Sequence, residues 1–369
     1  MKNMLYVTTV FEDENDGIWK KIKYTLCAYQ RLGYLIDFAY RTKAGYVINF
    51  GFNSEQSKVE RVNEHHKDLF FYNLSKKIIK KYDFLYIRKP FGGASFLFLN
   101  FLISKVKKGG GKVAFEIPTY PYRKEIKSVK NIISERLFQV SKSAYVHKID
   151  LIVYMGESSG NIWGRPALKI ANGIDLNKVQ ILKENLNSVS DEFIFVGVAR
   201  LSFWHGYDRL IEAVKNYKGN YKIKFIVIGN GEPELSRLNA LTKKHALEEK
   251  VLFLGAKFGN ELDMQYKKAH VCIDSIGRHR SGNQFNSSLK SKEYAAKGLP
   301  FIMSHKDDSF ENVNFIFNVS PDEEMINIDE IISWYEKLPT NTPVEMRAFA
   351  EQFLSWDIQC KKVLENIFY

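Results

Sequence analysis

Several sequence features that define common protein classes are missing from this chain. Its three cysteines, Cys27, Cys272 and Cys360, form no CxxC pair and no spacing typical of a disulfide framework, which indicates a reducing compartment. No apolar run approaches the roughly 18 residues that a membrane-spanning helix needs. No secretory signal peptide is visible, because the short apolar run at residues 4–10 leads into acidic residues. We therefore expect a cytoplasmic protein.

Motifs for metal and nucleoside triphosphate chemistry are also absent. The sequence has no HExxH motif, no Walker loop, no DxD motif and no cluster of residues at metal-ligand spacing. The Gly-Asn-Gly run at residues 229–231 is too short for a dinucleotide-binding fingerprint. No motif for RNA or DNA binding accompanies the basic charge, so nucleic acid is not expected as a partner.

What the sequence has in excess is positive charge. The formal net charge is +12, which favours an anionic partner such as a phosphorylated substrate or an anionic membrane surface. Residues 123–148 mix lysine and arginine with apolar residues. This segment predicts either a solvated helix face, which is the default for such a run, or a helix that docks on an anionic membrane leaflet.

The clearest local pattern is a strand–loop–helix–strand unit around residues 271–303. Residues 289–297 are good helix formers, Gly298 suits a left-handed C-terminal cap, and Pro300 stops the helix. The polar loop before the helix supplies its N-cap. Such a unit presents the free N–H groups of a helix N-terminus to an anion. Glu293 lies about one turn inside the helix, where it faces toward this site.

Strands and helices alternate along the whole chain, which predicts an α/β protein with parallel, doubly wound sheets. In the first half we expect strands at residues 4–10, 35–39, 84–87, 112–117, 151–154 and 169–175, and helices at 18–32, 69–80 and 96–107. In the second half we expect strands at 193–198, 224–228, 251–255, 271–274 and 301–303, and helices at 207–216, 233–246, 260–269 and 289–297. The polar run 183–191 marks a boundary, so the predicted parts are an N-terminal domain (1–187), a C-terminal domain (188–345) and a helix at the domain junction (346–369).

Two places in the first half are candidate ligand contacts. Gly17, in the first strand–helix loop, permits close approach of a ligand, and the alternative is a simple turn glycine. Glu116, Tyr120 and Arg123 come at the end of a predicted strand, and ligands bind at the carboxyl ends of parallel strands in such sheets. This mixture suits a sugar or a phosphate, and the alternative is a proline-stiffened surface loop.

An ordered set of motifs in the second half closely resembles glycosyltransferase family 4. The set comprises Ala171-Asn172-Gly173-Ile174-Asp175, Val198-Ala199-Arg200-Leu201, residues 205–213, Ile228-Gly229-Asn230-Gly231, residues 251–255, and the run from Leu289 through Glu293 to Pro300. The resemblance is strong over residues 170–305 and weak before them. It implies the GT-B fold, in which two Rossmann-like domains face each other across a cleft. It also implies transfer of a sugar from a nucleotide-diphosphate sugar with retention of anomeric configuration.

The resemblance assigns the donor diphosphate to Arg200. A guanidinium suits this role because it binds phosphate oxygens bidentately and stabilises the departing nucleoside diphosphate. Family members usually have a lysine five residues later, where this chain has His205. Either leaving-group stabilisation then depends more on Arg200, or His205 has a raised pKa beside the diphosphate. The remaining alternative is a histidine that caps or packs the turn before Gly206.

The rest of the donor site follows from the same resemblance. Glu293 matches the second of two family glutamates, which binds the ribose hydroxyls, whereas the position of the first is Phe285. The alternative for Glu293 is a salt-bridged surface residue. The other implied donor contacts are Asn283, Gln284 or Asn286 for the sugar, the amides around Ser288, Leu289 and Lys290 for the β-phosphate, Lys257 and Phe258 for the base, and the glycines Gly17 and Gly231.

Together these assignments predict a retaining hexosyltransferase that acts on a glycan or lipid-linked glycan acceptor, with a family-based expectation of surface polysaccharide biosynthesis. Arg200, His205 and Glu293 would be catalytic, and Glu116, Tyr120 and Arg123 would contact the acceptor. The resemblance implies no protein nucleophile, no cofactor and no metal. A peripheral position on the inner face of the plasma membrane would bring the basic first domain to lipid-pyrophosphate-linked acceptors. The alternatives are a nucleotide-sugar epimerase on the same fold and a non-catalytic partner subunit.

Overall fold

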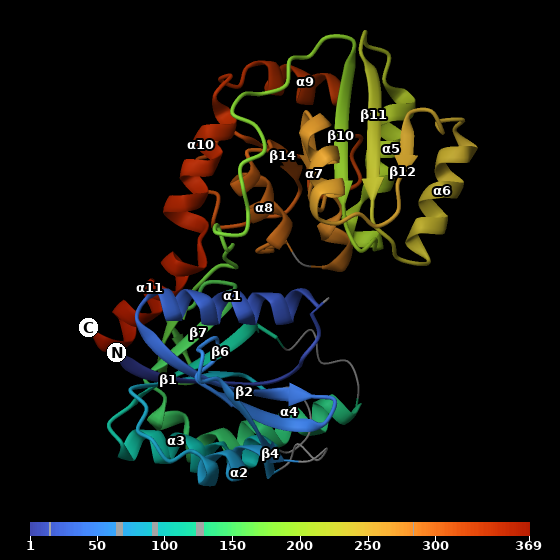
Figure 1. The fold of residues 1–369 in the computed structure, drawn as a ribbon. Helices are drawn as coiled ribbons and strands as arrows, with labels where there is room; N and C mark the ends of the chain where they lie inside the picture. The colour runs from blue at the N-terminus through green and yellow to red at the C-terminus, as the bar shows by residue number, and fades with distance from the viewer. Residues whose placement is uncertain (15, 64–68, 91–94, 123–128, 283) are drawn as a thin grey trace. The chain divides into compact units, whose positions relative to one another are not determined.

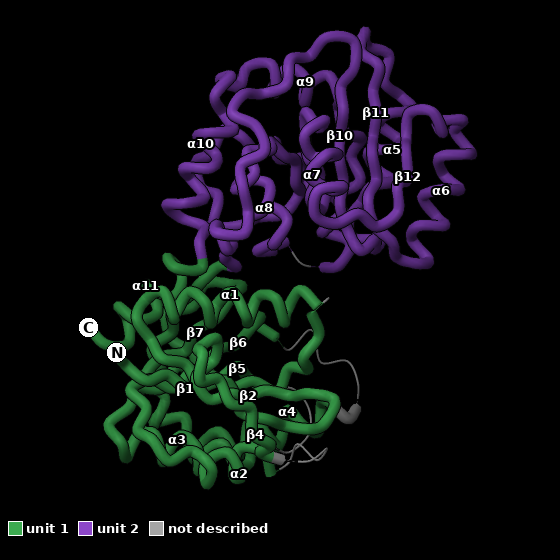
Figure 2. The backbone as a smooth tube through the Cα atoms, in the orientation of Figure 1, with its two compact units in different colours: residues 1–171, 356–369 green, residues 172–355 purple. Residues whose placement is uncertain are grey.

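The chain forms two compact units, shown in green and purple in Figure 2. The computed structural model describes residues 1–14, 16–63, 69–90, 95–122, 129–282 and 284–369. Unit 1 consists of residues 1–171 and 356–369, and unit 2 consists of residues 172–355. The chain therefore enters unit 2 and later returns to unit 1.

Unit 1 is built on a nine-stranded sheet with the order β4-β3-β2-β1-β5-β6-β7-β9-β8 (Figure 1). The apolar strand β1 is buried along most of its length and pairs in parallel with β2 and β5, as a strand covered on both faces does. β3 and β4 extend one edge as an antiparallel meander from β2. The strands are β1 (Lys2–Phe11), β2 (Tyr34–Thr42), β3 (Gly45–Phe50), β4 (Lys58–Asn63), β5 (Phe84–Arg88), β6 (Lys112–Tyr120), β7 (Leu151–Gly156), β8 (Asn161–Ile162) and β9 (Arg165–Lys169).

Helices cover both faces of this first sheet. α1 (Gly17–Arg31) and α11 (Trp356–Phe368) join one core, in which Trp19, Ile22 and Trp356 are buried. The other face is covered by α2 (Phe70–Lys77), η2 (Ser95–Phe98), α3 (Leu99–Lys108) and α4 (Val129–Ser141), followed by the short turns η4 (Lys142–Ala144) and η5 (Val146–Lys148) (Figure 1).

Unit 2 has a six-stranded sheet with the order β12-β11-β10-β13-β14-β15, and its neighbouring strands all pair in parallel. Helices again lie on both faces, so each face has its own hydrophobic core. The strands are β10 (Glu192–Val198), β11 (Lys222–Ile228), β12 (Val251–Phe253), β13 (Val271–Ile273), β14 (Phe301–Met303) and β15 (Ile316–Asn318). The helices and helical turns are η6 (Phe203–His205), α5 (Tyr207–Asn216), α6 (Glu234–Lys244), α7 (Gly259–Lys268), η7 (Arg278–Ser281), α8 (Leu289–Lys297), α9 (Ile328–Glu336), α10 (Thr342–Phe349) and η8 (Ala350–Leu354).

Two doubly wound α/β units confirm the fold class that the alternating pattern predicted. α5 and α8 begin and end at the predicted residues, and Gly298 caps α8 in the left-handed region at φ 74°. The hairpin strands β3 and β4, strand β15 and helix α9 were not predicted. The segment 169–175 was expected to be a strand, but β9 ends at Lys169.

The units divide at 171/172, whereas the sequence placed the boundary at 187/188. The reason is that the segment before the polar run packs on unit 2. The Asn172 side-chain amide donates to the carbonyl of Ser287, and the Leu182 N–H donates to the carbonyl of Lys297 at 3.1 Å. The polar run 183–191 therefore lies after the point at which the chain passes from unit 1 to unit 2.

The C-terminal segment is also divided differently from the prediction of one helix. α10 passes into a π-helical turn, η8, and Ser355 is extended before α11 begins at Trp356. The buried residues of α11, Cys360, Val363 and Ile367 among them, complete the core of unit 1. None of the described helices combines the length and apolar character needed to cross a membrane.

Candidate functional site

The candidate site lies at the carboxyl ends of the parallel strands of the unit 2 sheet, and we call this side of the sheet its edge. The loops that follow β10 and β11 touch there, because two glycines permit close backbone contact. A Cβ atom at Gly229 would lie 1.8 Å from the carbonyl oxygen of Ala199, and one at Gly231 would lie 2.4 Å from that of Leu201. The Leu201 N–H donates to the carbonyl of Asn230 at 2.8 Å. Gly231, predicted as a donor contact, therefore fixes the geometry of this edge.

The loop after β13 packs against the loop after β10 at a second pair of glycines. Gly206 has φ 70°, and a Cβ atom on it would lie 2.5 Å from the backbone nitrogen of Gly277. The Ile276 N–H donates to the carbonyl of His205 at 2.9 Å. The structure therefore brings the loop with Arg200 and His205 next to the loop that leads into α8, at one edge of the sheet.

Arg200 is the first charged residue after β10, and its side chain is exposed. The backbone on both sides is held in place, since the N–H of Ala199 donates to Ile228 and that of Leu201 donates to Asn230. Among the residues that the structure describes, no hydrogen bond or ion pair engages the Arg200 guanidinium. A rigid backbone with an unengaged guanidinium suits the binding of an anion from solution.

His205 caps its own turn. Its Nδ1 lies 3.1 Å from the backbone nitrogen of Ser202 and 3.2 Å from the Ser202 carbonyl oxygen. In the tautomer that caps the turn, Nδ1 accepts the Ser202 N–H and the ring proton is on Nε2. Burial, together with the nearby positive charge of Lys290, lowers the pKa of His205 to about 3. The alternative of a capping histidine describes the contacts of this residue, whose lowered pKa keeps the ring neutral at ordinary pH. The raised pKa was expected beside a bound diphosphate and stays a prediction.

The start of α8 is fastened to a buried carboxylate, Asp274, directly after β13. The N-cap Ser288 accepts the Lys290 N–H at 3.2 Å and donates its hydroxyl to Asp274 Oδ1 at 3.1 Å. Lys290 Nζ lies 3.1 Å from the same oxygen, and His305 Nε2 lies 3.7 Å from Oδ2. Burial alone would raise the pKa of Asp274, but Lys290, His305 and the hydrogen bonds hold it at about 2. Asp274 thus stays charged and fixes the helix N-terminus.

The sequence interpretation missed Asp274 and His305. Asp274 had been placed at the end of a predicted strand, which is the position where polar residues of an α/β site occur. That position was the available signal. His305 follows β14 with no recognisable motif around it, so its approach to Asp274 depends on the pairing of β13 with β14.

Glu293 faces the side of α8 that meets α7. Its carboxylate is 34% exposed and lies 3.5 Å from Lys297 Nζ, and Lys297 also pairs with Asp263 of α7. Burial raises the pKa of Glu293, and Lys297 opposes this shift. Its ion-pair partner is thus Lys297, while Lys290 pairs with Asp274. The carboxylate remains accessible enough to accept hydrogen bonds from a ligand.

The other predicted donor residues of unit 2 lie in loops or at the start of a helix. Lys257 pairs with Glu261 at 3.1 Å, and the Phe258 ring is 78% exposed at the start of α7. Gln284 and Leu289 are exposed, whereas Asn283 lies outside the described residues.

Phe285 occupies the place of the missing glutamate, and its ring is 37% exposed. Its backbone forms an isolated β-bridge with Lys306, which follows β14, and the Lys306 Nζ lies 5.9 Å from the ring centroid. The loop that contains Phe285 is therefore held by this β-bridge, with no carboxylate at position 285.

The predicted acceptor residues lie in unit 1 in different environments. Glu116 is 3% exposed, and its carboxylate pairs with Arg88 and lies 3.9 Å from Lys21 Nζ. A ligand would reach Glu116 only if these ion pairs opened. Tyr120 is half-buried at the end of β6, with its ring edge-on to Tyr154.

The two other predicted contacts in unit 1 are Arg123, which lies outside the described residues, and Gly17. Gly17 begins α1, and a Cβ atom on it would meet none of the described residues within 4 Å. Packing within the described part of the chain therefore does not require glycine at this position.

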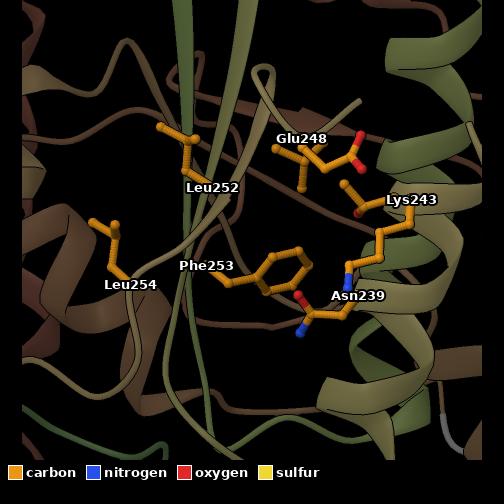
Figure 3. A pocket seen from close by; sticks show the side chains of 8 residues that line it. Asn239, Lys243, Glu248, Leu252, Phe253 and Leu254 are labelled. Carbon is orange, nitrogen blue, oxygen red and sulfur yellow. The ribbon is translucent and has the colours of Figure 1, made fainter. Parts of the chain in front are cut away.

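A separate pocket opens between α6 and the edge strand β12 (Figure 3). Asn239, Lys243, Glu248 and Phe253 are among the residues that line it, and none of the predicted site residues does. Within the described part of the chain, no group of His, Cys, Asp and Glu side chains is arranged to hold a metal ion.

Comparison with known proteins shows a similarity to one family over part of unit 2. Residues 178–275 match the family model described as "Glycosyl transferases group 1". Alpha-monoglucosyldiacylglycerol synthase from Acholeplasma laidlawii is 29% identical over 154 residues, which are 40% of this chain and 37% of that relative's length.

Solved structures resemble the whole chain. A glycosyltransferase from Rickettsia africae has a TM-score of 0.64 at 15% identity and covers 99% of this chain and 97% of its own. HepE from Anabaena, in complex with UDP-glucose, has a TM-score of 0.59 at 15% identity and covers 100% of both chains. These likenesses establish the GT-B fold, and the family-model match shows that residues 178–275 are similar to the group 1 glycosyltransferases.

Proposed function

We propose that the protein transfers a sugar from a nucleotide-diphosphate sugar to an acceptor hydroxyl. The observation that carries this proposal is the unengaged Arg200 guanidinium at the same sheet edge as the N-terminus of α8. A diphosphate held there meets a cation and free helix N–H groups together. The solved complex of HepE with UDP-glucose supports a nucleotide sugar as the donor.

In the proposed reaction Arg200 stabilises the negative charge that develops on the departing nucleoside diphosphate. His205 stays neutral and offers its Nε2–H as a hydrogen-bond donor. Glu293 accepts hydrogen bonds from the ribose hydroxyls. The acceptor hydroxyl attacks the anomeric carbon on the face that the diphosphate leaves, and a diphosphate oxygen takes its proton. This route gives retention and uses no protein nucleophile, metal or cofactor.

We further propose that the acceptor is a lipid-linked glycan or another lipid-anchored hydroxyl, used in building surface polysaccharide. The name of the Acholeplasma relative specifies a glucosylated diacylglycerol, which supports an acceptor at a membrane. The basic composition of the chain also supports an anionic partner, because opposite charges attract.

A panel of UDP-, ADP- and GDP-sugars tests the donor proposal by thermal shift, since a ligand that binds only the folded state raises the melting temperature. The expected result is stabilisation by one nucleotide series, weakened in Arg200→Ala and Glu293→Ala. Unchanged affinity in both variants would remove the assigned site.

Incubation with the donor alone distinguishes an epimerase, which would convert the sugar without an acceptor. Anomeric NMR of the product tests retention, and addition of EDTA tests independence from metal.

A further inference from the structure

Helix α4 has apolar side chains on two opposite faces. On the inward face, Phe138 is 1% exposed and packs edge-on against Phe96 at 5.6 Å between ring centroids. Ser134 is buried on the same side. The outward apolar residues are Ile132, Ile133, Leu137 and Val140, exposed by 39%, 56%, 45% and 74%. An ordinary surface helix would have polar residues there.

These outward residues form one continuous stripe along the helix. At about 100° per residue, residues 132, 133, 136, 137 and 140 fall within an arc of about 140°. Arg136 is the charged member of this arc, and its side chain is exposed. We call Ile132, Ile133, Arg136, Leu137 and Val140 the docking stripe.

Among the described residues of α4, no acidic side chain belongs to the docking stripe. The one acidic residue in α4 is Glu135, which points inward, where it accepts from Lys89 Nζ at 3.0 Å and the Tyr122 hydroxyl at 2.8 Å. The sequences of α2 and α3, which cover the same face of the sheet (Figure 1), contain no Asp or Glu. α3 instead exposes Lys105 and Lys108.

The neighbouring elements also expose apolar residues. η2 contacts α4, and its Leu97 is 45% exposed. One turn farther along, in α3, Phe101 is 51% exposed. Exposed apolar residues that gather on one part of a surface are typical of an interaction site.

We propose that the docking stripe of α4 lies in the interfacial region of an anionic lipid bilayer. The inference rests on the proposed use of a membrane-borne acceptor and names the surface that meets the membrane. The apolar side chains enter the acyl boundary, while Arg136 and the lysines of α3 reach the anionic headgroups. A second copy of this chain is the poorer occupant, because its basic surface and net charge of +12 would repel an identical one.

Vesicle sedimentation of the full chain tests the proposal without donor or acceptor. The native protein is expected to bind vesicles of phosphatidylcholine with phosphatidylglycerol, and to bind phosphatidylcholine alone far more weakly. The triple variant Ile133→Gln, Leu137→Gln, Val140→Gln is expected to lose about tenfold or more in vesicle partitioning. Because the three residues are exposed, the fold should tolerate the three substitutions. Circular dichroism and the melting temperature of the variant verify that it is folded.

A matched control replaces three exposed apolar residues of unit 2, Met264, Met325 and Val344, by glutamine. This control should bind vesicles as the native chain does. Equal binding by the α4 variant and the control would overturn the proposal, as would a native dimer in analytical ultracentrifugation that the α4 variant abolishes. Nucleotide binding by the same samples distinguishes the failure of the membrane proposal from the failure of the proposed glycosyltransferase function. Normal nucleotide binding with no vesicle binding would overturn only the membrane proposal.

Discussion

Asp274 and Lys290 form an ion pair beneath the first turn of α8, with Lys290 Nζ 3.1 Å from Asp274 Oδ1 and the carboxylate fully buried. The same oxygen accepts the hydroxyl of the N-cap residue Ser288. One carboxylate thus secures both the cap and the cation at the helix start that we propose to face the donor phosphates. The geometry of this helix start therefore depends on the contacts of a single side chain.

Replacement of Asp274 by Asn should be strongly destabilising. Removing one partner of a buried ion pair leaves the other charge uncompensated, which costs about 3–5 kcal/mol. Urea unfolding measures the loss, and the exposed Glu311→Gln is a control that should change little. An unfolding midpoint unchanged from the native protein would show that Lys290 does not need this partner.

His205 should make the protein less stable in mild acid. Its pKa is about 3 in the fold against 6.5 for the free side chain, so below pH 6.5 the unfolded chain binds a proton that the folded chain does not. The contribution of His205 to the free energy of unfolding is fully present above pH 6.5. It falls as the pH is lowered, and the loss is about 2 kcal/mol at pH 5.

His205→Asn isolates this effect, because the amide oxygen can still accept the Ser202 N–H. Denaturant unfolding between pH 7 and pH 5 should give a flatter profile for His205→Asn than for the native chain. Replacement of the exposed His147 by glutamine should leave the native slope intact. Parallel profiles for the native and His205→Asn proteins would contradict the lowered pKa.

Arg200→Ala should weaken nucleoside diphosphate binding without lowering stability. The guanidinium is exposed and engages no described residue, so its loss removes no native contact of that group. Charge-assisted hydrogen bonds contribute about 1.5–3 kcal/mol, which corresponds to roughly 10- to 150-fold in affinity. Calorimetric titration measures this, with Lys222→Ala at the start of β11 as the control. A destabilised Arg200→Ala protein would instead indicate a structural role.

The glycines of the two units should respond in opposite ways to alanine. Gly229→Ala places a methyl group 1.8 Å from the Ala199 carbonyl oxygen at φ 131°, which should cost about 2–4 kcal/mol. Gly17→Ala meets no neighbour and should leave the melting temperature unchanged or slightly raised. If Gly17→Ala folds normally but binds the nucleotide sugar more weakly, close approach of the ligand is the reason for glycine there. Equal melting temperatures for both variants would contradict the crowding at Gly229.

The part of the fold that could be predicted is the part where local chemistry and tertiary structure agree. α8 has its cap residue, helix formers, Gly298 and Pro300 in order, so its bounds follow from sequence alone. β4 has mixed polar composition at the edge of the sheet, and its identity as a strand depends on antiparallel pairing with β3. β3 is apolar and follows β2 through a two-residue turn, so its sequence did carry a strand signal that the prediction passed over.

The site was predictable at the level of loops and less so at the level of side chains. Arg200 and the α8 N-terminus meet at one sheet edge because β10 and β13 are neighbours, as a doubly wound order implies. The partners of the charged residues differ in how far they could be foreseen. Lys290 pairs with Asp274, a choice set by packing of α8 against the end of β13, whereas Glu293 and Lys297 have the i,i+4 spacing that the sequence itself offers.

The return of the chain to its first unit has a consequence for biosynthesis. Unit 1 takes its closing helix, α11, from residues 356–369, so its core stays open while all of unit 2 is being translated. Unit 2, by contrast, has its whole sequence once Ser355 has been added. A chain truncated before Trp356 would therefore contain all of unit 2, while the sheet of unit 1 would lack the part of its cover that α11 supplies.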